Sequence, residues 1–182
     1  MRQTTFVAIC CFCLIGLTAC GQVGKQAPQE TAASSSNANQ PAASTNSPPA
    51  DVVRASVPDV EIAAGGSAEA SVRLAIADGY HINANPPSFA YLKATELEVE
   101  PGEGVTAGKP VYPASITKRF SFSEKPLAVY EGAAEIRLPL NAASTASKGA
   151  RALRAKLRIQ ACDDQACYPP RVIETSIPVT VR

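Results

Sequence analysis

Apolar and polar residues alternate along several short stretches in the second part of the chain. The clearest stretches cover residues 68–76, 97–99, 134–140, 150–159 and 173–181. Because side chains along a strand point to opposite faces in turn, each stretch predicts a half-buried β-strand. Apolar positions between 52 and 62 predict one or two more short strands, and 80–83 predicts a short extended segment.

The stretch 150–159 has two interpretations. Leu153 and Leu157 are four residues apart and also fit one face of a helix. A strand is preferred, because its apolar residues alternate with bases. The apolar set is Leu153, Ala155, Leu157 and Ile159, and the basic set is Arg154, Lys156 and Arg158. The three bases are then expected to form a solvated face of a sheet.

Turn signals separate the predicted strands. Asp78-Gly79 and Pro101-Gly102 end two of them, and residues 85–87 (Asn-Pro-Pro) cannot lie in a central strand, because proline lacks a backbone donor. About seven to nine short strands with no long helical pattern are typical of an all-β, immunoglobulin-like antiparallel β-sandwich. We expect this domain to cover residues 51–182, which is long enough to bury a core without a disulfide.

Residues 1–19 predict a lipoprotein signal peptide. An apolar run at 6–17 follows Met1-Arg2 and is shorter than the roughly 20 residues that span a bilayer. The sequence Leu-Thr-Ala-Cys at 17–20 resembles a bacterial lipobox, in which Cys20 is lipidated and becomes the first residue of the mature protein. The alternative is an ordinary cleaved signal with a chance cysteine. Gly21 follows Cys20, which by resemblance to the bacterial sorting rule favours the outer membrane, with the periplasm as the working space.

Composition adds a tether and narrows the possible partners. Residues 20–50 are rich in Ala, Ser, Asn, Gln, Pro and Thr and predict a lipidated, disordered linker. The net charge of +1 gives no reason to expect a nucleic-acid partner. One histidine and six cysteines, four of them within the first 20 residues, do not suggest a metal site, and we expect no metal and no other cofactor.

Cys162 and Cys167 are separated by four residues, at the point where one predicted strand ends and a return segment begins. A turn of this size can bring two Cα atoms within the roughly 4.4–6.8 Å that a disulfide requires. The pair therefore predicts a disulfide, which could be a structural staple or a redox couple. A short loop restricts the unfolded chain less than a long one, so the pair would be a weak staple.

Three segments resemble the N-terminal periplasmic domain family of the thiol:disulfide interchange protein DsbD. They are QACDDQACYPP at 160–170, DGYHINANPP at 78–87 and FSFSEKPLAVYEG at 120–132. The resemblance implies an immunoglobulin-like sandwich in which Cys162 and Cys167 are a redox-active pair. It also implies partners: a thioredoxin-like or membrane-embedded protein that donates electrons, and periplasmic thiol–disulfide proteins that accept them. We expect the donor to be a separate protein.

The resemblance also implies which side chains surround the cysteine pair. The candidates for shielding the disulfide or lining its site are Phe122, Phe120, His81, Asn83 and Tyr168. His81 is in addition an acid–base candidate, because its ordinary pKa lies near 6.5; the alternative is a strand histidine without a role. Asp163 and Asp164 are expected to raise the pKa of the neighbouring thiol, because anions disfavour a thiolate.

Two functions remain open from the sequence. The first is a lipid-anchored thiol–disulfide exchange module, at most an oxidoreductase or electron carrier, that works through Cys162 and Cys167. The second is a non-catalytic, immunoglobulin-like binding lipoprotein in which the same pair forms a structural disulfide.

Overall fold

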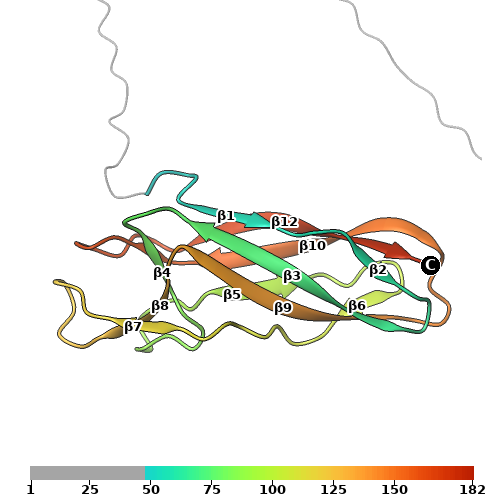
Figure 1. Cartoon of the computed structure of the whole chain (residues 1–182), viewed down its shortest axis with the longest axis horizontal. Coiled ribbons are helices and arrows are strands. Elements are labelled where there is room, and N and C mark those ends of the chain that lie inside the picture. Colours follow the sequence, from blue (N-terminus) through green and yellow to red (C-terminus); the bar gives the residue numbers. More distant parts are fainter. Residues whose placement is uncertain (1–47) are drawn as a thin grey trace, which may run out of the picture. The chain divides into compact units, whose positions relative to one another are not determined.

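The computed structural model describes residues 48–182. The predicted signal peptide, Cys20 and nearly all of the predicted tether lie outside the described residues. The described part forms twelve strands (Figure 1): β1 (Val53–Ser56), β2 (Val60–Ile62), β3 (Ser67–Ile76), β4 (His81–Asn83), β5 (Glu96–Val99), β6 (Val105–Ala107), β7 (Ile116–Lys118), β8 (Leu127–Tyr130), β9 (Ala133–Ala142), β10 (Gly149–Ile159), β11 (Ala161–Cys162) and β12 (Arg171–Val181). Residues 48–182 contain no helix that is long and apolar enough to cross a membrane.

Two four-stranded sheets form the body of the domain. One has the order β1-β3-β9-β6 and the other β2-β12-β10-β5. The alternation in β9 and β10 places every second side chain in the shared core, where Ile136, Leu138 and Leu157 are completely buried. Burial of such side chains stabilises the fold by about 1.5–3 kcal/mol each relative to exposure. The predicted immunoglobulin-like sandwich is confirmed.

The structure differs from the expectations in two respects. It has twelve strands instead of seven to nine, because strands such as β6, β7 and β11 contain only two or three residues and show no measurable alternation. One strand pair, β2 with β12, is parallel, although all other pairs are antiparallel as predicted. The stretch 150–159 forms strand β10, so the helical interpretation was wrong.

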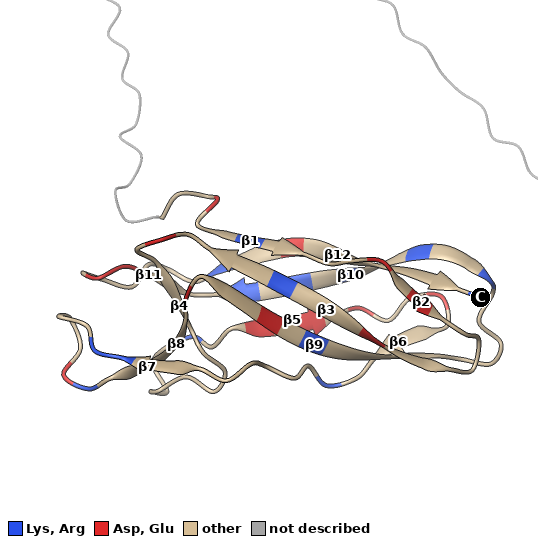
Figure 2. Ribbon diagram, in the orientation of Figure 1, with Lys and Arg blue, Asp and Glu red and all other residues tan. Residues whose placement is uncertain are grey.

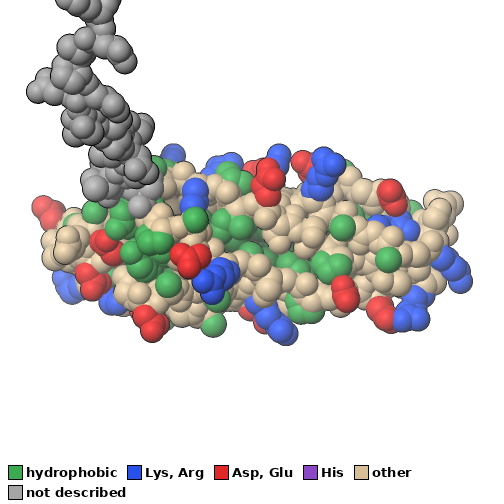
Figure 3. All heavy atoms as spheres, turned by 90° about the horizontal axis from the view of Figure 1, so that it is seen from above, with side chains coloured by type: hydrophobic (Ala, Val, Ile, Leu, Met, Phe, Trp, Pro, Cys, Tyr) green, Lys and Arg blue, Asp and Glu red, His purple; other side chains and the backbone are tan. Residues whose placement is uncertain are grey.

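The basic face of β10 lies beside acidic residues of β5 (Figure 2). Arg158 pairs with Glu96 at 2.9 Å and with Glu98 at 3.4 Å, and Lys156 lies 3.5 Å from Glu100. All these side chains are exposed, so each pair contributes at most about 1 kcal/mol. Acidic and basic side chains are also interspersed on the face seen in Figure 3. The bases of β10 therefore form a solvated face, as expected.

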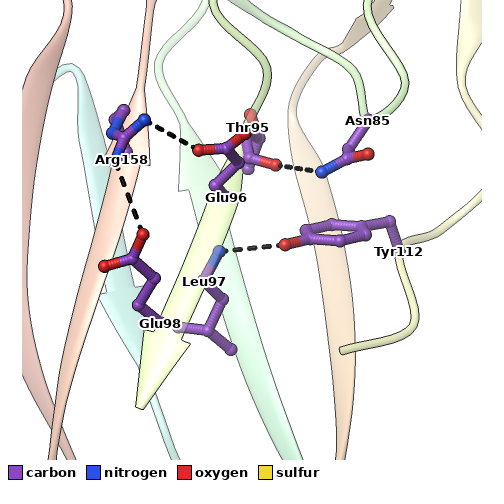
Figure 4. A network of polar contacts seen from close by, with 7 residues as sticks. All are labelled: Asn85, Thr95, Glu96, Leu97, Glu98, Tyr112 and Arg158. Atoms are coloured by element: carbon purple, nitrogen blue, oxygen red, sulfur yellow. Dashed lines mark hydrogen bonds and ion pairs between the residues drawn. The ribbon is translucent and has the colours of Figure 1, made fainter. Parts of the chain in front are cut away.

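A third sheet with the order β11-β4-β8-β7 lies at one end of the sandwich (Figure 2). The chain leaving β4 is held by polar contacts, shown in part in Figure 4. The Asn85 side-chain amide donates to the carbonyl of Thr95 at 2.9 Å, and the Leu97 amide donates to the Tyr112 hydroxyl at 2.9 Å. The Asn85 contact joins the chain just after β4, which carries two of the predicted site residues, to the residue that precedes β5.

Candidate active site

Cys162 and Cys167 form a disulfide and face each other in a short antiparallel bridge. The Asp163 amide donates to the Ala166 carbonyl at 3.0 Å, and the Tyr168 amide donates to the Ala161 carbonyl at 2.9 Å. The cysteines lie between these two bonds and so form a non-hydrogen-bonded antiparallel pair, the type in which the Cα atoms are closer together. Their Cα atoms are 3.9 Å apart, which is closer than the range expected from the sequence. The predicted disulfide is confirmed.

The segment from Cys162 to Cys167, here called the cysteine loop, is organised by the carboxylate of Asp163. Its Oδ1 atom accepts hydrogen bonds from the amides of Gln165 at 2.8 Å and Ala166 at 2.9 Å, and its Oδ2 atom accepts one from the Tyr168 hydroxyl. These hydrogen bonds lower the pKa of Asp163, and the bond from the Tyr168 hydroxyl contributes most. The same bond raises the pKa of Tyr168 to about 12. Sequence reasoning missed this role, although Asp at the start of a tight turn is its usual signal.

The two cysteines differ in their exposure. Cys162 is completely buried at 0 % relative exposure, whereas Cys167 is half-buried. Cys167 lines an open pocket of about 470 Å³ together with Gln160, Tyr168 and Pro169. An approaching reagent therefore reaches the disulfide from the side of Cys167.

His81 lies opposite Cys162 in the register between β4 and β11. Residues that face each other across an antiparallel pair carry their side chains on the same face of the sheet, about 4.5–5.5 Å apart at Cβ. His81 is only 1 % exposed. The tertiary structure thus brings a buried imidazole next to the buried cysteine, 81 positions away in the sequence.

Three rings form an aromatic stack beside this strand pair. The ring of Phe120 lies 4.0 Å from that of His81 at an angle of 17°, and Phe122 lies 5.4 Å from Phe120. Both phenylalanines belong to the cap loop, defined here as residues 119–126 between β7 and β8. Phe120 is 7 % exposed and Phe122 is 37 % exposed. The Ser121 hydroxyl donates to the Asp164 carbonyl at 2.9 Å, which ties the cap loop to the cysteine loop.

Burial dominates the electrostatics of His81. It lowers the pKa of the imidazole, because a charged ring would lose hydration. Glu131, Asp164 and Asp163 oppose this shift, and Lys118 adds to it. The Nε2 atom is buried and has no hydrogen-bond partner among the described residues. Burial thus disfavours the charged form of the His81 ring, and one of its polar atoms is left without a partner among the described residues.

Asn83 is completely buried and connects β4 to the cysteine loop indirectly. Its amide donates to Gln160 Oε1 at 3.0 Å and to the Lys93 carbonyl at 3.2 Å. The Gln160 amide in turn donates to the Tyr168 carbonyl at 3.1 Å. Gln160 was not singled out from the sequence, because nothing in its local pattern distinguishes it from any other polar residue beside a strand.

The sequence matches the family described as "Thiol:disulfide interchange protein DsbD, N-terminal" over residues 50–177. The chain belongs to the DsbD N-terminal domain family. A search of curated protein sequences finds no match.

Among solved structures, the chain is similar to the reduced DsbD N-terminal domain of Neisseria meningitidis, with 22 % identity, a TM-score of 0.48, and 73 % of this chain and 90 % of that chain covered. It is also similar to the N-terminal periplasmic domain of ScsB from Proteus mirabilis (14 %, TM-score 0.47, 70 % and 45 % covered). A third similar structure comes from the complex of the DsbD and PilB N-terminal domains of N. meningitidis (20 %, TM-score 0.45, 74 % and 88 % covered).

Membership of the DsbD N-terminal domain family confirms the resemblance drawn from the three sequence segments. The folded chain brings the predicted neighbours together at the third sheet: His81 opposite Cys162, Phe120 and Phe122 in the aromatic stack, and Tyr168 directly after the cysteine loop and bonded to its Asp163. Asn83 reaches the loop only through Gln160. Within residues 48–182, no group of three His, Cys, Asp or Glu side chains is arranged to hold a metal ion.

Proposed function

We propose that this protein is a periplasmic thiol–disulfide exchange module that passes reducing equivalents through Cys162 and Cys167. The observation that carries the proposal is the asymmetry of the disulfide, in which Cys162 is completely buried and Cys167 lines an open pocket. The chain also belongs to the DsbD N-terminal domain family. The asymmetry supplies one point of attack and one protected leaving group.

Reduction would proceed in two exchanges. A thiolate of a reduced thioredoxin-like or membrane-embedded donor attacks the sulfur of Cys167, the bond to Cys162 breaks, and Cys162 leaves as a thiolate. The second thiol of the donor, as its thiolate, then attacks the donor sulfur of the mixed disulfide and releases Cys167. The donor is oxidised by two electrons and the Cys162–Cys167 pair takes them up, with two protons bound by the resulting thiols. The reverse sequence reduces a disulfide of a periplasmic redox protein.

The anchoring of the protein is part of the same proposal. Lipidated Cys20 would hold the domain at a membrane, with the outer membrane favoured by Gly21. A flexible linker over residues 20–50 would place the domain about 30 Å from the lipid on average, at about 5–6 Å × √n. Mass spectrometry of the N-terminal peptide would show an acylated Cys20, and Cys20→Ser would release the protein from the membrane fraction.

The competing function is a binding lipoprotein in which the disulfide is only a structural clip. Two observations favour exchange. The main hydrophobic core contains neither cysteine, so it does not depend on the bond for its packing. The disulfide closes a loop of only five positions, which contributes little chain entropy.

The deciding experiment compares Cys162→Ser with Cys167→Ser in the full-length protein, with oxidised glutathione as the probe and peptide mapping to locate the adduct. Cys162→Ser should form a mixed disulfide at Cys167, and Cys167→Ser should react at least tenfold more slowly, because Cys162 is buried. The double variant controls for the fold. A reduction potential below about −300 mV, with thiols released only on unfolding, would instead identify a structural clip.

A further inference from the structure

The Nε2 atom of His81 is one of five buried side-chain polar atoms without a partner in the described part of the chain, and it belongs to the residue that faces Cys162. Its residue is 1 % exposed, and the atom has no hydrogen-bond partner among the described residues. More than 90 % of buried polar groups have at least one partner, and leaving one without costs about 1–3 kcal/mol. The atom is therefore available to a partner that arises when the disulfide opens.

The surroundings of His81 identify that partner. Phe120 covers one face of the ring at 4.0 Å, so hydrogen bonds can form only at the edge of the ring. Cys162 lies directly opposite in the strand register and is completely buried. Lys118, a base that acts on the pKa of His81, is paired with Glu131 at 2.7 Å. In the disulfide, the Cys162 sulfur carries no proton and no charge.

We propose that His81 is a positioning residue that donates a hydrogen bond from Nε2 to the Cys162 sulfur when the disulfide opens. The proposal rests on the proposed function. When a donor thiolate bonds to the Cys167 sulfur, the electron pair of the broken bond stays on the sulfur of Cys162. This thiolate forms in a buried place beside the carboxylates of Asp163 and Asp164, which disfavour negative charge. An N–H donor on the residue that faces Cys162 would offset part of that cost.

The same contact links His81 to the redox state. In the oxidised protein, burial keeps the pKa of His81 low. A thiolate at Cys162 favours the imidazolium, so the pKa of His81 should rise in the step in which Cys162 is ionised. The charged groups that act on the ring are Glu131, Asp163, Asp164 and Lys118.

The test uses the fact that His81 is the only histidine of the chain, so that the imidazole resonances in ¹⁵N-labelled protein have one source. Spectra of the oxidised and the dithiothreitol-reduced protein are recorded between pH 5 and 8. Reduction should move the Nε2 resonance, because the Cys162 sulfur is then released from the disulfide and can accept the N–H. Cys167→Ala, which keeps the Cys162 thiol, should show the resonance of the reduced protein without dithiothreitol, and Cys162→Ala should not.

A kinetic comparison separates the hydrogen bond from packing. His81→Gln keeps an N–H donor, whereas His81→Phe keeps an aromatic ring and removes the donor. The rate at which dithiothreitol opens the disulfide should fall about tenfold in His81→Phe, which corresponds to about 1.4 kcal/mol, and should stay within about twofold in His81→Gln.

Unchanged imidazole resonances on reduction would overturn the role of His81, and so would a wild-type opening rate in a folded His81→Phe. The proposed function would survive that result as long as Cys167 still forms mixed disulfides. If His81→Phe does not fold, the spectra of the wild-type protein decide alone. Loss of mixed-disulfide formation in Cys162→Ser would count against the proposed function itself.

Discussion

Asp163 illustrates how a single carboxylate can shape a reactive loop. Its two oxygens accept hydrogen bonds from two amides and one hydroxyl of the next five residues. The sequence suggested only that its negative charge would act on a thiol. The structure adds a geometric role, because the same charge holds the turn that closes the disulfide.

Replacing Asp163 with Ala should loosen the cysteine loop. We expect the free energy of unfolding to fall by about 1 kcal/mol, since the lost bonds are to a charged but partly solvated group. Because the pKa of Asp163 is lowered in the folded protein, this difference should be full at neutral pH and should shrink as the pH falls below the ordinary value of 3.8. Urea denaturation at pH 7 and pH 3 measures both effects.

Asp164→Ala is the matched control. Asp164 carries the same charge one position later, but only its backbone carbonyl accepts a hydrogen bond, from Ser121. An equal loss of stability in the two variants would show that charge, and not the turn, explains the effect of Asp163.

At the scale of elements, the cap loop joins β7 to β8 and covers the end of the third sheet. Its two phenylalanines lie in different environments. Phe120 is part of a small apolar cluster with Leu92, Leu127 and Val129, whereas Phe122 is more than one-third exposed. Phe120 therefore holds the loop in place, and Phe122, which contacts the stack through Phe120, is the side chain that can move with the smaller loss of packing.

Alanine at Phe122 and at Phe120 should affect different properties of the protein. Phe122→Ala should leave the free energy of unfolding within about 0.5 kcal/mol of the wild type and should speed the opening of the disulfide by dithiothreitol several-fold, because less of the site is covered. Phe120→Ala should cost about 3 kcal/mol of stability, since it leaves a cavity. Thiol release and urea denaturation, measured on the same samples, separate the effects. An unchanged opening rate in Phe122→Ala would exclude shielding by this side chain.

At the scale of the whole described domain, the sandwich and the third sheet carry different tasks. The core between the two large sheets contains neither cysteine, and the disulfide lies in the sheet at one end (Figure 1). A redox change at the end of the domain can therefore occur while the body stays folded.

Reduction should leave the sandwich intact. Loop closure over so few residues predicts a loss of about 2 kcal/mol in the free energy of unfolding, which is smaller than the stability of an ordinary domain. Far-ultraviolet circular dichroism should be unchanged on reduction, and the urea midpoint should fall modestly. The Cys162→Ser/Cys167→Ser variant should match the reduced protein. Complete unfolding on reduction would show that the bond is required for the fold.

Sequence reasoning was most reliable where the signal is local. Alternation along β3, β9, β10 and β12 follows from the geometry of a half-buried strand, so those elements could be predicted from single stretches of sequence. The disulfide was also predictable, because its two cysteines are only five positions apart. The family followed from three short segments in a fixed order.

The tertiary structure decided which of these local elements meet. Pairing of β11 with β4 sets His81 against Cys162, and the cap loop then brings Phe120 onto the imidazole. The parallel pairing of β2 with β12 likewise joins distant parts of the chain. Strand formation depends on neighbours along the chain, and the sequence therefore determined it. Pairing between strands depends on how all buried faces pack at once, and only the folded structure determined the burial of Cys162 and the unpaired atom of His81.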